Sequence, residues 1–215
     1  MWDMKSSRFF EVQILGKGPG CDDAPMYYEH PDIQTWGLNT HILSRPLDMV
    51  FEPHDVEWWL KNWDKKELFH KIERGYPKHI ERVNELQVPY LTLKHYDFIP
   101  TSKAYPAETI SQFFGIDYFT GGIDYMMAYA LWQGVDKIDL YGVHTVKDDE
   151  YEYQKPSLEF WIGVAVGSGT EIRVHGSDTL MQPIYQGRIY TNEGGDADGL
   201  RYGYFCKPVV NTISV

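Results

Sequence analysis

The sequence predicts a single α/β domain of the Rossmann-like type, with a mostly parallel sheet and helices on both faces. Short β-rich runs alternate with helical patterns along the chain. Glycine clusters follow directly after strand-like runs, and no internal repeat, low-complexity tract or linker interrupts this order. We therefore expect one nucleotide-binding-like domain over residues 1–215, in which residues 177–215, rich in Gly and Tyr, form an irregular C-terminal extension.

Three short strands are expected near the start of the chain. Residues 9–16 (FFEVQILG) are β-rich and run straight into the glycine turn of residues 16–20 (GKGPG). Residues 33–39 (IQTWGLN) predict a second strand. Residues 48–54 (DMVFEPH) predict a third strand, which Pro53 closes.

Helical spacing begins after the third strand. Apolar residues recur there at i, i+3, i+4 and i+7 and form one stripe: Val56, Trp59, Leu60 and Trp63. A second helix is predicted from Pro77, because proline suits the first helical turn. Three of its apolar residues are expected to point inward: Ile80, Val83 and Leu86. Residues 88–95 predict a strand and residues 96–106 a loop, before a short helix with the apolar residues Ile110, Phe113 and Phe114.

Residues 118–144 (YFTGGIDYMMAYALWQGVDKIDLYGVH) are the most informative stretch of the chain. They predict a glycine-opened amphipathic helix, ended by Gly134, and then a strand over residues 137–143. A polar, acidic loop follows. Pro156 is expected to begin another helix, which stops at a Gly-Ser-Gly triplet, and residues 171–176 predict the last clear strand.

Composition and charge exclude several classes of protein. The net charge of −11 means that most of the surface repels phosphate, so no bulk nucleic-acid binding is expected. The two cysteines form neither a CxxC pair nor a disulfide framework. The N-terminal residues carry no signal-peptide pattern, and no apolar run approaches the length of a membrane span. We expect a cytoplasmic protein without a membrane partner, and the sequence leaves a homo-oligomer open.

The glycine turn after the first strand is the first candidate binding site. Gly16 and Gly18 allow the backbone to approach a ligand closely, and exposed amides in such a turn suit a phosphate, with which Lys17 would pair. The turn matches neither GxGxxG nor a P-loop. The alternative is a tight turn without a ligand, carrying a solvent-exposed lysine.

Two further candidates lie at the ends of the helix–strand unit. Thr120 as N-cap, followed by Gly121 and Gly122, offers unpaired amides and a positive dipole end to an anion, with ordinary capping as the alternative. At the other end, Gly142 and His144 follow a strand at the edge where open α/β sheets bind their ligands. His144 is predicted to act as a general base or to hold a phosphate, and a structural role is the alternative.

The acidic segment before Pro156 is a fourth candidate. Glu150, Tyr153 and Gln154 offer a carboxylate, a phenol and an amide, which suit recognition of a sugar or of the edge of a base. A solvated acidic loop is the alternative. A Ser/His/Asp hydrolase is not indicated, because no GxSxG motif occurs.

The end of the third strand places Glu52, His54 and Asp55 close together in the sequence. Their spacing fits no standard zinc pattern, and no second histidine element completes one. An acid that orients the neighbouring histidine is therefore favoured over a metal, and we predict no metal site.

Several of these motifs resemble a known family. The segment ILGKGPG is similar to the strand and GNGPS turn that open bacterial sialyltransferases of the nucleotide-sugar-using α/β type, and WGLN is similar to a motif in which Asn39 takes the place of a nucleotide-contacting asparagine. Residues 118–143 resemble the TSG-helix-strand block of the same family, with Gly121 in place of its serine and His144 in place of an acidic residue. A further resemblance is to hydroxymethylpterin pyrophosphokinase-like domains.

The motifs VFEPHD, YFTGG, DEYEYQKPSLEFWIGVA and YGY also resemble an uncharacterised Rossmann-like family of phages and prophages. The resemblance implies a protein of a bacterial host or a phage. It departs from the sialyltransferases between Thr145 and Leu158, where they place a catalytic histidine and this chain has none.

The resemblance implies a pocket for a nucleotide or nucleotide-sugar, built from Gly16 to Gly18, Asn39, Thr120 to Gly122 and Gly142 to His144. The expected function is glycosyltransferase-like: transfer of a nucleotide-activated sugar, of the CMP or UDP type, to a hydroxyl acceptor, with His144 as first base and Glu150 as second. No cofactor is firmly implied. Two alternatives stay open: a Mg²⁺-dependent pyrophosphokinase-like enzyme using Glu52 and Asp55, and a non-catalytic phage binding or assembly protein.

Overall fold

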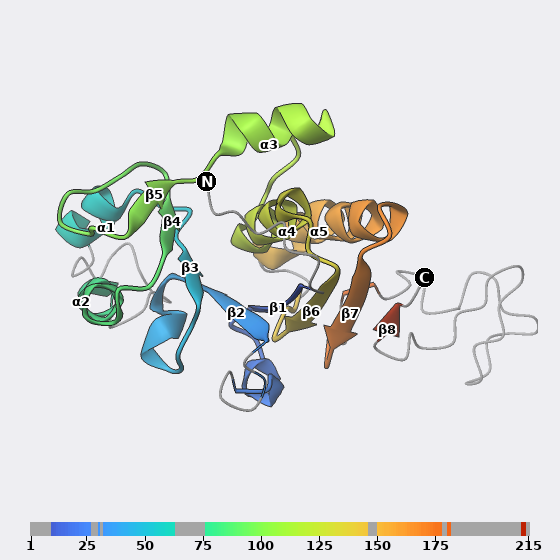
Figure 1. Ribbon diagram of the computed structural model, residues 1–215, viewed down its shortest axis with the longest axis horizontal. Helices are drawn as coiled ribbons and strands as arrows, with labels where there is room; N and C mark the ends of the chain where they lie inside the picture. Colours follow the sequence, from blue (N-terminus) through green and yellow to red (C-terminus); the bar gives the residue numbers. More distant parts are fainter. Residues whose placement is uncertain are drawn as a thin grey trace, which may run out of the picture.

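The computed structural model describes residues 10–26, 30, 32–62, 76–145, 150–177, 180–181 and 212–213, and of residues 150–152 and 212–213 only the backbone. One sheet of eight strands runs through this part of the chain in the order β5-β4-β3-β2-β1-β6-β7-β8 (Figure 1). Strands β1 to β7 are parallel, and β8 pairs antiparallel with β7. The strands are β1 (Glu11–Leu15), β2 (Ile33–Leu38), β3 (Met49–Phe51), β4 (Tyr90–Thr92), β5 (Ser102–Ala104), β6 (Lys137–Tyr141), β7 (Glu171–His175) and β8 (Thr212–Ile213).

The strand order reverses beside β1, which lies in the middle of the sheet. From β1 the chain moves outward through β2, β3, β4 and β5, and then returns to place β6 on the other side of β1. Leu15 of β1 consequently lies opposite both Gly37 of β2 and Tyr141 of β6. Such a reversal leaves a crevice outside the carboxyl ends of β1 and β6, where open α/β sheets bind their ligands.

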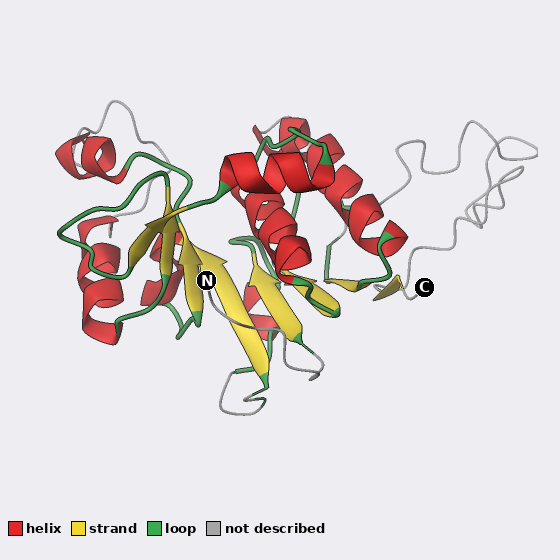
Figure 2. Cartoon of the chain, turned by 45° about the horizontal axis from the view of Figure 1, so that its top comes forward, coloured by secondary structure: helices red, strands yellow, loops and turns green. Residues whose placement is uncertain are grey.

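Helices lie on both faces of the sheet, which confirms the predicted α/β class (Figure 1, Figure 2). One face packs against α3 (Ala107–Phe114), α4 (Gly122–Gln133) and α5 (Glu150–Gly167). The other packs against the 3₁₀ helix η2 (Asn39–Leu43) and against α1 (Val56–Asn62) and α2 (Tyr76–Leu86). A second 3₁₀ helix, η1 (Cys21–Asp23), follows the glycine turn. Among the described helices, none has the length and apolar character needed to cross a bilayer.

Two separate cores result from the alternation of side chains along the strands. Ile14 of β1 points into the core beneath α4 and α5, whereas its neighbour Leu15 points into the core beneath η2, α1 and α2. Both side chains are fully buried. The two cores hold the middle of the sheet rigid, so the turns that follow β1 and β6 start from fixed positions.

Helix α4 is buried on nearly all sides, although its sequence predicts an amphipathic helix. Residues 126–131 are all buried, because the helix lies between the sheet, α3 and α5. Tyr129 packs edge-on against Trp36 and Phe51 of the sheet, with ring centroids 5.7 and 5.6 Å away. Gly134 ends the helix in the left-handed conformation at φ 75°, as predicted.

The start of α5 was predicted wrongly. The helix begins at Glu150, so Pro156 lies inside it rather than at its first turn. The segment before the proline is rich in Glu, Gln and Lys, which are good helix formers and extend the helix toward the N-terminus. Proline removes one backbone donor from a helix interior, but it did not mark the boundary here.

Other predictions fail where local pattern and tertiary packing disagree. Leu86, expected to point inward, is 41% exposed, and Phe113, one of the apolar residues of the short helix, is 65% exposed. The predicted loop of residues 96–106 contains β5, a short polar strand without an apolar period. Trp63 lies outside the described residues. So does most of the expected C-terminal extension, of which β8 adds an edge strand to the sheet.

Candidate functional site

The turns that follow β1 and β6 bind one another at the reversal point of the sheet. The amide of Gly16 donates to the carbonyl of Tyr141, and the amide of Gly18 donates to the carbonyl of Gly142, each over 2.8 Å. These bonds continue the β1–β6 ladder beyond the strand ends. They bring together the two segments that the sequence singles out as the first and third candidate sites.

The glycines in these turns are required by the contact between the turns. A Cβ on Gly16 would lie 2.4 Å from the carbonyl oxygen of Gly142, and a Cβ on Gly18 would lie 2.6 Å from the imidazole of His144. Gly142 itself has φ 62°, a conformation that favours glycine. Glycines at these positions predicted close approach to a ligand, whereas Gly16 and Gly18 lie against the turn after β6, and Gly142 lies against Cys21 and Gly18.

A cavity of about 220 Å³ opens beside these two turns, and we name it the switch-point cavity. It is bounded by the turns after β1 and β6, the first turn of α4 and the start of α5. Seven of its lining residues are predicted site residues: Gly16, Lys17, Gly18, Gly122, Gly142, His144 and Gln154. The other lining residues include Leu38, Ile123, Asp124 and Leu158.

Lys17 turns its ammonium inward, although the residue as a whole is exposed. Its Nζ donates to the side-chain oxygen of Asn39, and also to the hydroxyl of Thr40 over 3.1 Å. Burial of the ammonium lowers the pKa of Lys17 to about 8, and the Glu52 carboxylate acts in the opposite direction. Asn39 therefore contributes to the site through Lys17.

His144 fastens the turn after β6 to the turn after β1. Its Nε2 lies 2.8 Å from the carbonyl oxygen of Pro19. A carbonyl only accepts hydrogen bonds, so Nε2 carries a proton in this contact, and in the neutral ring the basic nitrogen is Nδ1. The side chain is half-buried and lines the switch-point cavity.

The start of α4 differs from the prediction. Gly121, not Thr120, is the N-cap residue. The carboxylate of Asp124 accepts hydrogen bonds from the amides of Thr120 and Gly121, over 2.9 and 3.1 Å, and from the hydroxyl of Ser157 over 2.5 Å. Burial raises the pKa of Asp124, and these hydrogen bonds act against that effect. Two of the amides that were expected to be available to an anion, those of Thr120 and Gly121, are thus already bound.

Of the acidic segment before Pro156, only part lines the switch-point cavity. Gln154 lines the cavity, and its side-chain oxygen lies 2.5 Å from where a Cβ on Gly121 would stand. Tyr153 is 81% exposed and is not among the lining residues. Glu150 begins α5, but its side chain lies outside the described structure.

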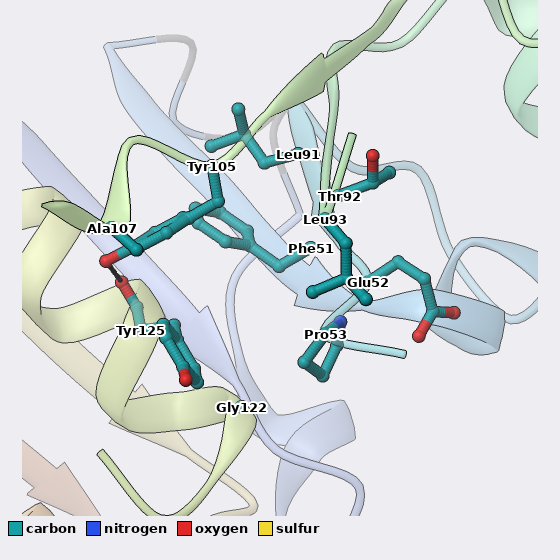
Figure 3. A pocket seen from close by; sticks show the side chains of 10 residues that line it. All are labelled: Phe51, Glu52, Pro53, Leu91, Thr92, Leu93, Tyr105, Ala107, Gly122 and Tyr125. Atoms are coloured by element: carbon teal, nitrogen blue, oxygen red, sulfur yellow. Dashed lines mark hydrogen bonds between the residues drawn. The ribbon is translucent and has the colours of Figure 1, made fainter. Parts of the chain in front are cut away.

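A second cavity, of about 150 Å³, lies beside the switch-point cavity and shares Gly122 with it (Figure 3). Its lining is mostly apolar and aromatic: Phe51, Glu52, Pro53, Leu91, Thr92, Leu93, Tyr105, Ala107, Gly122 and Tyr125. The hydroxyl of Tyr105 donates to the carbonyl of Tyr125 over 2.9 Å, which fixes the Tyr105 ring. Sequence reasoning missed this cavity, because its residues come from four segments without a shared motif.

The predicted pairing of an acid with a histidine at the end of β3 is confirmed. His54 Nδ1 lies 2.5 Å from Glu52 Oε1. Asp55 serves a different purpose, since its carboxylate accepts the amides of Glu57 and Trp58 at the start of α1. Within the described ranges, no group of three or more His, Cys, Asp or Glu side chains is arranged to hold a metal ion.

Arg45 is a buried residue near the site that the sequence analysis did not identify. Its guanidinium donates to the carbonyls of Cys21, Ala24 and Pro25 over 2.9 to 3.2 Å. It thereby holds the segment that follows the glycine turn. One arginine between Ser44 and Pro46 carries no sequence signal for burial, so this role was not predictable.

Comparison with known proteins bears on the fold. No family model matches the sequence, and no curated protein matches it at a significant level. The chain is similar to the monofunctional α-2,3-sialyltransferase Cst-I of Campylobacter jejuni, with a TM-score of 0.50 and 14% identity over 94% of this chain and 91% of that chain. It is also similar to Campylobacter jejuni CstII in complex with CMP (TM-score 0.49, 13% identity, 93% and 89% covered). A third similar structure is CST-II with a trisaccharide acceptor and CMP (TM-score 0.48, 14% identity, 76% and 80% covered).

At these identities the likeness to Cst-I concerns the fold. The chain thus has a sialyltransferase-like α/β fold, as the resemblance of its motifs implied.

Proposed function

We propose that this protein is glycosyltransferase-like: it binds a nucleotide-activated sugar and transfers the sugar to a hydroxyl acceptor. The observation that carries the proposal is the switch-point cavity, which Lys17, the paired glycine turns and Gln154 line together. The sialyltransferase-like fold supports it, because Cst-I is a sialyltransferase and covers nearly the whole chain.

The donor phosphate is assigned to the Lys17 side of the cavity. Lys17 supplies a positive charge there, in a protein of net charge −11. The start of α4 is the less suitable end, because Asp124 already accepts the amides of Thr120 and Gly121. Stabilising the negative charge that develops on the departing phosphate is the main catalytic effect expected from Lys17.

His144 is assigned to the phosphate as well, which is the second of its two predicted roles. It lines the same cavity as Lys17. Because its Nε2–H is directed at the carbonyl of Pro19, the ring would offer Nδ1–H to a phosphate oxygen in its protonated form. Gln154 lies across the cavity, where its amide suits the polar edge of the sugar or the base.

The alternatives differ in what they require. A Mg²⁺-dependent pyrophosphokinase-like enzyme needs carboxylates free to hold the metal, whereas Glu52 is bound by His54 and Asp55 caps α1. No observation favours that reading. A non-catalytic phage binding or assembly protein would keep the fold without binding a nucleotide. The ligand panel described next distinguishes it from the proposed enzyme, because nucleotide binding would contradict it.

A ligand panel tests the proposal. The purified chain is titrated with CMP, UDP, GDP, ATP and their sugar conjugates, and its melting temperature is recorded, since binding to the native state raises that temperature. We expect one nucleotide class to raise it in wild type and to lose most of its effect in Lys17→Met. The matched control is Lys94→Met, whose ammonium pairs with Glu57 on the surface and lies in neither cavity. A melting temperature that no compound of the panel shifts contradicts the proposal.

A further inference from the structure

The second cavity has the size of one six-membered ring. Its volume is about 150 Å³, and an apolar cavity of about that volume holds a single benzene molecule. The lining runs from Phe51 and Leu91, which are buried, to Leu93 and Ala107, which are exposed. A ligand can therefore enter from solvent and bury one ring against apolar side chains.

Most polar groups of this lining already have partners. The hydroxyl of Tyr105 donates to the carbonyl of Tyr125 over 2.9 Å, and the hydroxyl of Thr92 donates to the carbonyl of Lys94. The backbone is paired as well, since the amide of Tyr105 donates to the carbonyl of Thr92 over 2.7 Å. The protons of both hydroxyls are thus used inside the protein.

The charge of the second cavity disfavours an anionic ligand. Among the lining residues that the structure describes, Glu52 is the one acidic residue and none is basic. The Glu52 carboxylate accepts the amide of His54 over 3.0 Å, and in Figure 3 it is turned away from Tyr105 and Tyr125. A carboxylate or phosphate of a ligand would find no positive partner here, so the cavity suits a neutral group.

These properties favour an apolar ring over a sugar ring. A sugar carries hydroxyls around its whole rim, and a buried hydroxyl that loses water without gaining a partner is unfavourable. An apolar ring has no such loss. It gains hydrophobic contact with Leu91 and edge or stacking contacts with the rings of Phe51 and Tyr105.

The hydroxyl of Tyr125 is the polar group that can orient such a ligand. Within the described part of the chain this hydroxyl makes no hydrogen bond. Tyr125 follows Gly122 by three positions on α4, so both lie on one face, and a long side chain on a helix leans toward the N-terminus. Figure 3 shows the Tyr125 ring running from α4 toward Gly122. Its hydroxyl is thus directed to the end of the second cavity that meets the switch-point cavity.

We propose that the second cavity is the acceptor subsite, and that the acceptor is a neutral phenol or benzylic alcohol rather than a carbohydrate. Its ring lies among the apolar side chains, and its hydroxyl lies beside Tyr125 and faces the donor across Gly122. The inference rests on the proposed glycosyl transfer. Neither cavity reaches the roughly 300 Å³ of an ordinary small-molecule site, whereas the two together provide about 370 Å³, enough for a donor and a small acceptor.

The transfer balances within the groups named. The acceptor oxygen forms a bond to the anomeric carbon of the donor sugar. The bond between that carbon and the phosphate oxygen breaks, and its electron pair leaves with the nucleotide. The hydroxyl proton passes to water at the exposed end of the second cavity. The products are a glycoside, a free nucleotide and a hydrated proton.

Calorimetric titration without a donor tests the site separately from the transfer. Benzyl alcohol is compared with benzoate, which has the same ring and a charge, with methyl glucoside, which has a sugar ring, and with toluene, which has no hydroxyl. We expect wild type to bind benzyl alcohol about tenfold more tightly than benzoate or methyl glucoside, because each of these brings buried polar groups without partners. Equal or tighter binding of benzoate or methyl glucoside contradicts the inference.

Two variants locate the ring. Tyr125→Phe is expected to weaken binding of benzyl alcohol by about 3- to 10-fold and to leave that of toluene unchanged, since only one hydrogen bond is lost. Its control is Tyr118→Phe, because Tyr118 is 40% exposed and lines neither cavity. Ala107→Trp fills the exposed end of the cavity and should abolish binding of both compounds. Its control is Ala104→Trp, an exposed position on β5 outside both cavities.

Transfer is then measured with the nucleotide-sugar that raises the melting temperature, with benzyl alcohol or lactose as acceptor. We expect benzyl glycoside from wild type and little from Ala107→Trp. If benzyl alcohol binds but no nucleotide does, the proposed function fails and takes the acceptor role with it, whereas the ring site stands. If a nucleotide binds and lactose accepts the sugar while benzyl alcohol neither binds nor reacts, the inference is wrong and the proposed function stands. Binding of benzyl alcohol that neither variant changes also overturns the inference.

Discussion

His144 Nε2 lies 2.8 Å from the carbonyl oxygen of Pro19, a residue 125 positions earlier in the chain. This contact, together with the two backbone hydrogen bonds beside it, makes one rigid rim from two turns at the reversal point of the sheet. Because the switch-point cavity is bounded by this rim, its shape depends on how closely the turns approach each other.

Substitution of Gly16 by Ala is expected to lower the free energy of unfolding by about 2 kcal/mol, because the new Cβ would stand 2.4 Å from the backbone oxygen of Gly142. Backbone cannot move aside as a flexible side chain can. Urea unfolding measures the change. The control is Gly163→Ala on α5, where nothing lies within 4 Å and a gain of about 0.5 kcal/mol is expected. Equal effects of the two variants would contradict the close contact of the turns.

Replacement of Arg45 by Met is expected to lower the free energy of unfolding by about 3 kcal/mol, since three carbonyls lose a charged donor in a buried place. Arg82→Met is the surface counterpart. Its partner Glu85 is also exposed, so a loss of about 0.5 kcal/mol or less is expected. Chemical denaturation of both variants tests the difference, and similar losses would rule out the structural role of Arg45.

The affinity for a nucleotide is expected to fall as the pH rises through about 8, because Lys17 then loses the charge that attracts phosphate. If only the charged lysine binds, Kd rises about tenfold between pH 7 and pH 9. Titration calorimetry with the best nucleotide of the panel measures this dependence. Lys17→Met should bind more weakly and show a flat profile over the same range, and a flat wild-type profile would contradict the assignment of the phosphate.

Stability is expected to fall as the pH is lowered from 6.5 toward 4. Burial lowers the pKa of His41 and of His79 to about 4, and Lys17 and Arg45 add to the effect on His41. In the unfolded chain these two histidines bind protons below about pH 6.5, whereas in the folded chain they stay neutral until about pH 4. Acid therefore favours unfolding within that window. Each histidine accounts for roughly 2 to 3 kcal/mol by this linkage.

His79→Gln tests this dependence, because it removes one of the two buried histidines whose pKa is lowered. Urea unfolding at several pH values should show a shallower decline for this variant than for wild type. His95→Gln changes a histidine whose side chain is 54% exposed and should leave the slope as it is. A wild-type stability that stays level from pH 6.5 to pH 4 would contradict the buried, neutral state of both rings.

Much of the fold was predictable because its strongest signals are local. A β-rich run followed at once by glycine predicts β1, and the run before Gly142 predicts β6; both strands lie where expected. Parallel strands carry their ligand site at their carboxyl ends, so the two turns were recognisable as candidates before their contact was known. The pairing of Glu52 with His54 was predictable for another reason, since the two residues are only two positions apart in the sequence.

The remainder depends on tertiary packing that no local pattern contains. β5 is a polar triplet that becomes a strand because β4 supplies its partner. Thr120 has the chemistry of an N-cap, yet the cap falls on Gly121 because Asp124 reaches back to both amides. The second cavity needs Tyr105, Tyr125 and the end of β3 to meet, and aromatic residues are too common in this chain to single out two of them.

The central position of β1 has a consequence for synthesis of the chain. β1 leaves the ribosome before β6, and one of its two edges stays unpaired until β6 follows, since Glu11 to Leu15 pair with Lys137 to Tyr141. Until then the nascent chain exposes an unsatisfied strand edge, which is a template for pairing with other chains. Fragments that end before residue 137 should therefore aggregate, and a chaperone that shields that edge should be needed most while the middle of the chain is being made.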